Sequence, residues 1–192
     1  MRIIGGTAAG LILNAPKGLA VRPTPDLVRQ AIFNSLGGRV LEARVLELFG
    51  GTGALSLESL SRGAAQATCV ELAPKHARYI EQNFEALGLP RERFQIRTQD
   101  VFAALPQLAA SGAQFDLILA DPPFGEKNVG RRSTSLSQRL LDDESLPRLL
   151  SADGRFVLGH TKRDTLTIPP GWQEVKMLKH GDSMVRFLKR AT

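Results

Sequence analysis

Residues 44–53 read Arg-Val-Leu-Glu-Leu-Phe-Gly-Gly-Thr-Gly, a strand-like apolar run that ends in a glycine-rich turn. The spacing of apolar residues over 54–62 predicts a helix, and Gly63 is placed to end it. A strand at residues 67–71 and a helix at residues 74–87 are expected next. This repeated order of strand, turn and helix predicts a parallel sheet, because parallel strands need a long crossover connection between them.

The same alternation extends toward the C-terminus. Residues 115–120 are almost all apolar, which is typical of a central strand covered on both faces. The remaining expected elements are strands at 94–98 and 155–158, helices at 101–110 and 136–150, and a closing antiparallel pair at 173–178 and 184–188. The sequence therefore predicts an α/β fold in which a mostly parallel sheet carries helices on both faces.

The N-terminal segment departs from this pattern. Residues 1–17 contain apolar runs broken by glycines and by an Asn-Ala-Pro turn, which predicts a β-hairpin outside the main sheet. Asp26 is placed to cap a helix that runs to Leu36. We expect residues 1–36 to form an extension and residues 37–192 to form the main domain. The sequence shows no linker long enough to separate the two, so a single domain is expected.

Composition restricts the class of protein. The chain has 192 residues, of which 43% are hydrophobic and 23% are charged, which fits one folded domain and excludes a disordered chain. No apolar stretch approaches the roughly 20 residues of a membrane-spanning helix or forms the core of a signal peptide. The single cysteine, Cys69, is expected as a buried thiol, and a cytoplasmic location is expected.

The charge favours a polyanionic partner. Lys and Arg number 25 against 19 Asp and Glu, which gives a net charge of +6. Basic residues gather in the first forty positions, after residue 126 and in the tail; the first two groups are Arg2, Lys17, Arg22, Arg29 and Arg39, and Lys127, Arg131, Arg132 and Arg139. Aromatic residues make up only 6%, so phosphate contacts rather than base stacking are expected to supply most of any RNA affinity.

Four motifs follow the four main strands, at the edge where open α/β sheets bind ligands. The first is Glu47-Leu-Phe-Gly-Gly-Thr-Gly53, whose small residues let a ligand approach the backbone. It is not the dinucleotide pattern G-x-G-x-x-G, because Ser56 stands where the third glycine is required. Glu47 would repel a pyrophosphate but would tolerate a cationic ligand.

Two single acids form the next two motifs. Glu71 ends the second strand, where an acid commonly accepts hydrogen bonds from both hydroxyls of a ribose. Asp100 follows the third strand, where it could accept a bond from the amino group of an adenine. Each also has a plain structural interpretation: Glu71 as a solvated strand end, and Asp100 as the N-cap of the following helix.

The fourth motif is Asp121-Pro-Pro-Phe124, directly after the most apolar strand. Prolines donate no hydrogen bonds, so this loop offers acceptors only, namely the Asp121 carboxylate and the Pro122 carbonyl. Such a pair suits the two N–H groups of an exocyclic amine on a base, and Phe124 could stack on the ring. The competing interpretation is a stiff turn without chemistry.

The four motifs together resemble the class I S-adenosylmethionine-dependent methyltransferases, and Asp121-Pro-Pro-Phe124 resembles their amine-methylating loop. Further stretches are similar to the RsmD family: Met1-Arg-Ile-Ile-Gly-Gly6, Lys17-Gly18, Arg22-Pro-Thr24, Val28-Arg-Gln-Ala-Ile-Phe-Asn34, Leu60-Ser-Arg-Gly-Ala64 and Lys179-His-Gly-Asp-Ser183. That family methylates N2 of one guanine in small-subunit (16S) ribosomal RNA. The chain departs from the family at Glu47 and Gly50, where Asp and Ala are usual, and at Phe124, where Tyr is usual.

The resemblance implies a Rossmann-like class I methyltransferase fold with a seven-stranded, mostly parallel sheet. It implies S-adenosylmethionine as the cofactor, no metal, and ribosomal RNA as the partner, within an assembled small subunit and with a monomeric enzyme. The catalytic residues expected are Asp121, Pro122, Pro123 and Phe124. The cofactor-binding residues expected are Glu47, Phe49, Gly50, Gly51, Gly53, Glu71, Leu72, Asp100, Val101 and Asp121. The RNA-binding residues expected are Arg2, Lys17, Arg22, Lys127, Arg131 and Arg132.

Other functions share part of this pattern. An adenine-N6 methyltransferase acting on RNA or DNA would use the same motifs, because that amine presents the same two donors. Methyltransferases acting on small molecules or proteins fit the basic charge and the N-terminal hairpin less well. A nicotinamide-dependent dehydrogenase would need the third glycine. An RNA-binding module without enzymatic activity has no need for Asp121-Pro-Pro-Phe124 beside Glu71 and Asp100.

Overall fold

Seven strands form one sheet in the computed structural model, which describes residues 1–15, 24–123, 128 and 131–191. The strand order is β3-β2-β1-β4-β5-β7-β6. Strands β1 to β5 run parallel, and the β6–β7 hairpin adds two antiparallel strands to one edge. Their bounds are β1 Arg44–Leu48, β2 Gln66–Glu71, β3 Phe94–Thr98, β4 Phe115–Ala120, β5 Leu150–Thr161, β6 Trp172–His180 and β7 Ser183–Arg190. The predicted mostly parallel α/β sheet is confirmed.

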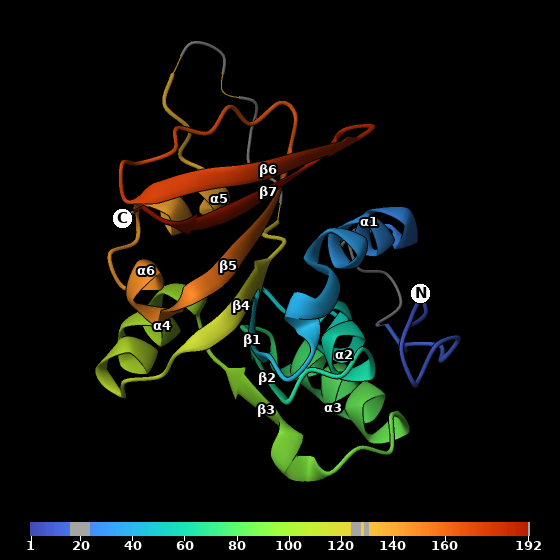
Figure 1. Cartoon of the computed structure of the whole chain (residues 1–192). Helices are drawn as coiled ribbons and strands as arrows, with labels where there is room; N and C mark the ends of the chain where they lie inside the picture. Colours follow the sequence, from blue (N-terminus) through green and yellow to red (C-terminus); the bar gives the residue numbers. More distant parts are fainter. Residues whose placement is uncertain (16–23, 124–127, 129–130, 192) are drawn as a thin grey trace.

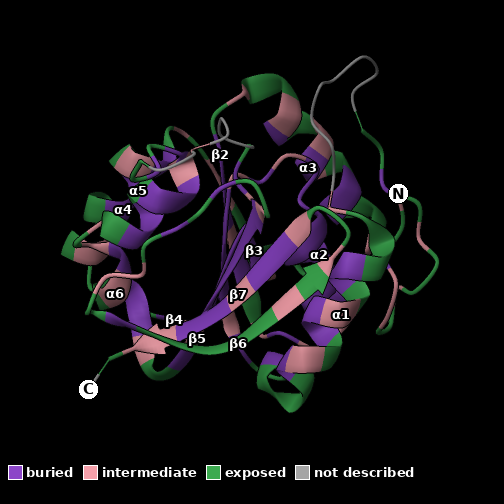
Figure 2. Cartoon of the chain, turned by 90° about the horizontal axis from the view of Figure 1, so that it is seen from above, coloured by how far each residue is buried: buried purple, intermediate pink, exposed green. Residues whose placement is uncertain are grey.

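Helices cover both faces of the sheet (Figure 1). One face carries α1 Asp26–Leu36, α2 Ala54–Ser61 and α3 Pro74–Ala86, and the other carries α4 Val101–Ala110, α5 Leu136–Asp142 and α6 Leu146–Leu149. Two short 3₁₀ helices, η1 Gly37–Val40 and η2 Arg91–Arg93, complete the elements. The central strands lie between these layers and are buried (Figure 2), so each face of the sheet forms its own hydrophobic core.

The chain direction places the ligand-binding edge. Strand β1 has β2 on one side and β4 on the other, so the connections leave β1 in opposite directions. A crevice forms at such a reversal, outside the carboxyl ends of the strands. The four motifs predicted from the sequence all follow the carboxyl ends of β1 to β4 and therefore share one edge.

The prediction of one helix over residues 136–150 is wrong. The structure has two helices, α5 and α6, and β5 begins already at Leu150. The break occurs because the Asp143 carboxylate accepts hydrogen bonds from the backbone N–H groups of Ser145 and Leu146, which starts a new helix. Pro147 occupies the first turn of α6, where its missing N–H costs nothing.

The N-terminal segment forms the predicted hairpin outside the sheet. Arg2 and Ile12 form an antiparallel bridge, and backbone hydrogen bonds join Ile3 to Leu11 and Leu13 to Met1. Side chains of α2 and α3 hold this hairpin against the main domain: Glu58 accepts from Ile4 and Gly5, Ser61 bonds Gly5 and Ala8, and Asn83 bonds Asn14 at both its backbone groups. The division of the chain at residue 36 stays a prediction.

The first turn of α1 differs from expectation. Asp26 is the first residue of the helix rather than its cap, and Pro25 occupies the capping position without a side-chain bond. The Asp26 carboxylate instead pairs with Arg29 at 3.0 Å. Arg29 is 0% exposed and so does not belong to the basic surface that the sequence suggested. It lies on the buried face of α1 with Ile32, Phe33 and Leu36.

Candidate functional site

Glu47 lies beneath the glycine-rich turn, not in open solvent. It is only 3% exposed, and its carboxylate accepts hydrogen bonds from the backbone N–H groups of Leu55 and Ser56, at 3.3 and 2.9 Å. These are the free N–H groups of the first turn of α2. Burial raises the pKa of Glu47 to about 7, against the bonds from Ser56 and Leu55 that lower it. The acid thus fixes the turn to the helix.

The raised pKa of Glu47 predicts a pH-dependent stability. Its pKa rises from 4.5 to about 7 on folding, so the protonated form favours the folded state. This stabilisation is present below the unfolded pKa and is lost as the pH rises through 7, by about 3 kcal/mol, since one pKa unit is roughly 1.4 kcal/mol. Denaturant unfolding of wild type and Glu47→Gln between pH 4 and 8 measures it as the change in their difference. Parallel curves for the two proteins would contradict the prediction.

Glu71 is buried at the end of β2, at 7% exposure, which contradicts the interpretation of a solvated strand end. One carboxylate oxygen accepts a hydrogen bond from the N–H of Gly51 at 2.7 Å, and the other accepts from the N–H of Ala73 at 2.8 Å. Nδ1 of His76 lies 3.3 Å from the second oxygen. Glu71 therefore ties the glycine-rich turn of β1 to the end of β2.

The glycine-rich turn packs closely on β2 and α3. A Cβ on Gly50 would lie 2.4 Å from Sγ of Cys69, which leaves no room for a larger residue. Gly51 and Gly53 have φ of 58° and 73°, the left-handed region in which glycine is unstrained. Phe49 takes φ 61° without that freedom, and its ring meets Phe102 edge-on. The turn is thus held in a conformation that directs its backbone toward the carboxyl edge of the sheet.

The remaining expected cofactor residues differ in exposure. Leu72, directly after Glu71, is 65% exposed and offers an apolar surface at this edge. Asp100 is exposed and caps α4 through a bond from the N–H of Ala103 at 3.1 Å, as one of its two interpretations predicted. Val101 is buried and packs in the core instead. Leu72 and Asp100 are therefore exposed at this edge, whereas Val101 belongs to the core; cofactor binding by these residues stays a prediction.

Asp121 follows β4 and points into the crevice. The hydroxyl of Thr24 donates a hydrogen bond to its Oδ2, and a Cβ on Gly159 would lie 2.4 Å from its Oδ1. Burial raises the pKa of Asp121, and the bond from Thr24 lowers it. Pro122 is buried and Pro123 is exposed, whereas Phe124 lies outside the described residues.

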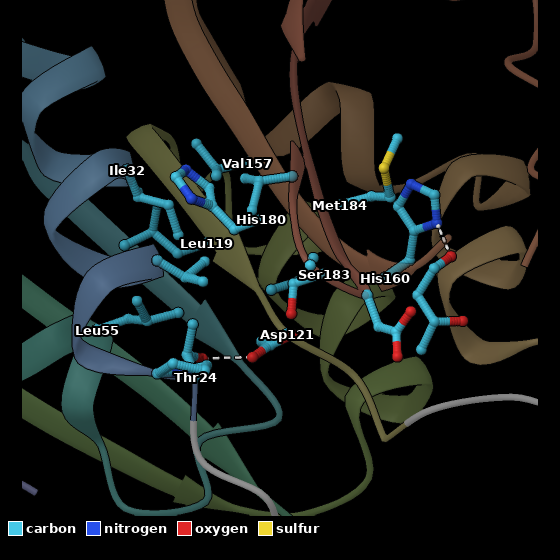
Figure 3. A pocket seen from close by; sticks show the side chains of 18 of the residues that line it. Thr24, Ile32, Leu55, Leu119, Asp121, Val157, His160, His180, Ser183 and Met184 are labelled. Atoms are coloured by element: carbon cyan, nitrogen blue, oxygen red, sulfur yellow. Dashed lines mark hydrogen bonds between the residues drawn. The ribbon is translucent and has the colours of Figure 1, made fainter. Parts of the chain in front are cut away.

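A cavity of about 360 Å³ opens beside Asp121. Thr24 and Asp121 meet at one end of it, joined by their hydrogen bond (Figure 3). Its apolar walls come from α1, α2 and strands β4 and β5: Val28, Ile32, Leu55, Leu119 and Val157. The volume falls in the range of about 300–1,000 Å³ that is typical of small-ligand pockets. The pocket is therefore large enough to hold a small ligand beside the Asp121 carboxylate.

The β6–β7 turn adds polar residues that were not predicted from the sequence to belong to the site. His180, Asp182 and Ser183 line the pocket, and Asp182 pairs with Lys162 at 2.7 Å. These residues belong to the stretch Lys179-His-Gly-Asp-Ser183, which supported the family resemblance without a role. The sequence therefore contained a motif at these positions. Its place at the carboxyl edge of the sheet depends on the antiparallel pairing of β6 and β7.

The expected RNA-binding residues fall into two groups. Lys17, Arg22 and Lys127 lie outside the described residues. Arg2, Arg131 and Arg132 are exposed; Arg132 pairs with Asp142 at 2.6 Å, and Arg2 lies 3.8 Å from Asp26. RNA binding by this set stays a prediction.

Comparison with known proteins gives these features a context. The family described as Conserved hypothetical protein 95 matches residues 1–189. Ribosomal RNA small subunit methyltransferase D of Escherichia coli (strain K12) is 36% identical over 191 residues, which cover 99% of this chain and 90% of that protein. The chain belongs to this family of methyltransferases. The resemblance to the RsmD family that the motifs predicted is confirmed.

Solved structures agree with the fold of the RsmD family. The structure of yhhF from Escherichia coli is 30% identical, has a TM-score of 0.79, and matches over 99% of this chain and 97% of that one. SMU.776, solved in complex with SAH, has a TM-score of 0.66 over 85% of this chain and 48% of its own. At 20% identity it supports the fold alone.

Two further observations concern metals and membranes. Within the described ranges, no group of three or more His, Cys, Asp or Glu side chains is placed to hold a metal ion. None of the helices in that part of the chain combines the length and the apolar character needed to cross a bilayer.

Proposed function

We propose that the protein transfers a methyl group from S-adenosylmethionine to the exocyclic N2 amine of a guanine in small-subunit ribosomal RNA. The observation that carries this proposal is the position of Asp121. Asp121 follows β4 at the same edge of the sheet as Glu71, which ends β2. It also lines the pocket to which the β6–β7 turn contributes. Membership in the RsmD family and the name of the Escherichia coli relative support the choice of substrate.

The residues at the Glu71 edge fit the proposed cofactor. The carboxylate of Glu71 is fixed by two backbone N–H groups, and the oxygen that accepts from Gly51 keeps a lone pair for a ribose hydroxyl. The other oxygen also lies 3.3 Å from Nδ1 of His76, so a second hydroxyl would share that oxygen with the imidazole. Leu72 offers an exposed apolar face to an adenine, and Asp100 an exposed acceptor to its amino group. In the glycine-rich turn between them, Gly50, Thr52 and Gly53 are buried, and Gly51 is partly exposed toward this edge of the sheet. When bound, S-adenosylmethionine supplies an electrophilic methyl group on a sulfonium.

Asp121 and Pro122 would act by aligning the target amine with the methyl group. A guanine N2 amine is a poor nucleophile because its lone pair is delocalised into the ring. The Asp121 carboxylate and the Pro122 carbonyl can accept its two hydrogens, which favours the geometry in which the lone pair is free. The negative charge of Asp121 also stabilises positive charge that develops on the nitrogen. Holding the amine nitrogen in line with the methyl group increases the rate further, because the two groups then react within one complex.

The pocket implies that the base leaves its stack. A paired or stacked guanine cannot reach a carboxylate inside a protein crevice, so it must be turned out into the pocket. The apolar walls provided by α1 and strands β4 and β5 would cover the ring. The exposed basic residues Arg2, Arg131 and Arg132 would contact phosphates around it.

The proposed setting follows from the substrate. We expect the protein to act in the cytoplasm on an assembled small ribosomal subunit. We expect it to act as a monomer, as the resemblance to the RsmD family implies.

Transfer of labelled methyl from S-adenosylmethionine tests the proposal. Purified protein is incubated with unmodified small ribosomal subunits, or with the free RNA, and the digested nucleosides are identified. We expect N2-methylguanosine, formed faster on the assembled subunit than on free RNA. N6-methyladenosine would instead show an adenine methyltransferase, and no labelled nucleoside on either substrate would contradict the proposal.

A further inference from the structure

Thr24 lies just before α1 and contacts Asp121, the first residue after β4. Its hydroxyl donates a hydrogen bond to Oδ2 of Asp121, although 97 positions separate the two residues in the chain. Both side chains line the same pocket (Figure 3). Of the described residues, Thr24 alone donates a hydrogen bond to this carboxylate. The contact joins the segment before α1 directly to the proposed acceptor of the amine.

Arg29 fixes Thr24 from the inside of the protein. Its Nη1 donates a hydrogen bond to the Thr24 carbonyl at 3.1 Å, and its Nη2 donates to the Arg2 carbonyl and to the Asp26 carboxylate. The guanidinium is 0% exposed, and its Nε has no hydrogen-bond partner within the described part of the chain. A buried charge with fixed acceptors of this kind restricts the backbone around it. The Thr24 backbone therefore cannot drift away from Asp121 without breaking a buried bond.

Gly159 restricts the other side of the carboxylate. The space that a side chain would fill at Gly159, in β5, is taken by Asp121, since a Cβ there would lie 2.4 Å from Oδ1 and 3.1 Å from Cγ. Oδ2 is held by Thr24 and Oδ1 lies against a bare backbone. The carboxylate thus has one orientation determined by two elements far apart in sequence.

We propose that Thr24 is a positioning residue for methyl transfer, whose hydroxyl orients the Asp121 carboxylate toward the target amine. This inference rests on the proposed function and adds a role for the N-terminal segment beyond RNA contact. The bond from Thr24 also opposes the effect of burial, which raises the pKa of Asp121. Loss of the hydroxyl would therefore leave a carboxylate that is free to rotate and more easily protonated.

Other charged groups face the same pocket and bear on the pH dependence. His160 and Arg163 come from β5 and the loop after it, and His180 and Asp182 come from the end of β6 and its turn. His160 is buried beside Arg186, whose Nε donates to its Nε2 at 3.0 Å, and its pKa is lowered by burial and by that charge. These groups are unchanged in a Thr24 variant, so the comparison with wild type isolates Asp121.

The test compares Thr24→Val, which keeps the shape and removes the donor, with Thr24→Ser, which keeps the donor. Single-turnover methyl transfer to small ribosomal subunits is measured from pH 5.5 to 9. We expect Thr24→Val to react about tenfold more slowly near neutral pH, as expected for loss of a hydrogen bond to a charged group. Its acid limb should move to higher pH, so that part of the rate returns in alkaline buffer. Thr24→Ser should follow the wild-type profile.

Thr167→Val provides the matched control, because it makes the same change at an exposed position outside the pocket. Cofactor and RNA affinities of Thr24→Val, measured by calorimetry and filter binding, should stay within twofold of wild type. A rate loss that is equal at every pH, or a wild-type profile for Thr24→Val, would overturn the positioning role. An inactive wild type would instead overturn the proposed function, so the two failures are distinguishable.

Discussion

Asp121→Ala should reduce the single-turnover rate of methyl transfer by about 10²–10³, the usual effect of removing one preorganised electrostatic group. The Asp121 carboxylate faces the pocket, and Thr24 and Gly159 already fix its orientation. The variant leaves the apolar walls intact, so capture of the base should persist. The rate is measured with labelled S-adenosylmethionine and unmodified small ribosomal subunits, at saturating concentrations of both.

Asp121→Asn separates orientation from charge in the same assay. Its amide keeps the shape and one acceptor oxygen but cannot balance positive charge on the nitrogen, so an intermediate rate is expected. Cofactor affinity should change much less than the rate in both variants, because the proposed mechanism directs the Asp121 carboxylate toward the target amine, although Asp121 was also expected to border the cofactor. A folded Asp121→Ala protein that transfers methyl at the wild-type rate would contradict the mechanism of amine alignment.

Glu71→Ala should weaken binding of S-adenosylmethionine by about 10- to 100-fold, corresponding to roughly 1–3 kcal/mol for lost hydrogen bonds to a charged group. The substitution removes the proposed acceptors of two ribose hydroxyls. It also releases the N–H of Gly51, which holds the glycine-rich turn against β2. Isothermal calorimetry in the absence of RNA measures the affinity directly.

Glu85→Ala is the matched control for this experiment, since it removes an exposed glutamate on the outer side of α3. Its affinity for the cofactor should equal that of wild type. If Glu71→Ala folds and binds with unchanged affinity, the role of Glu71 is limited to holding the turn.

Much of the fold could be predicted because apolar periodicity and turn residues agree along the chain. The run 115–120 is apolar except for Asp116 and is indeed a largely buried central strand. The prediction of a single helix at 136–150 was wrong because leucines continue at helical spacing across the break. The determinant was local side-chain chemistry: Asp143 accepts two backbone N–H groups and starts a second helix. The spacing of apolar residues does not predict such a side-chain hydrogen bond.

The placement of Glu71 and Asp121 at one edge of the sheet was predictable, because each lies at the carboxyl end of a strand. Thr24 and Arg29 were not assigned, because their roles depend on contacts between distant segments. The basic-cluster interpretation placed Arg29 on the surface, although its spacing with Ile32, Phe33 and Leu36 puts it on the buried face of α1. The helical spacing of Arg29 with these apolar residues indicates burial, whereas its charge alone suggests an exposed position. The residues of the β6–β7 turn were likewise recognisable only as part of a family motif.

The anchoring of the N-terminal hairpin determines when the active site can be completed during synthesis. Glu58 and Asn83 lie 54 and 69 positions after the backbone groups that they bind, and Asp121 lies 97 positions after Thr24. These contacts have high sequence separation, so they close only after the intervening chain has been made and folded. The N-terminal hairpin therefore docks only after α2 and α3 have been made, although its own residues are synthesised before them. A nascent chain that ends before β4 has no Asp121 for Thr24 to hold, so the enzyme becomes competent late in its own translation.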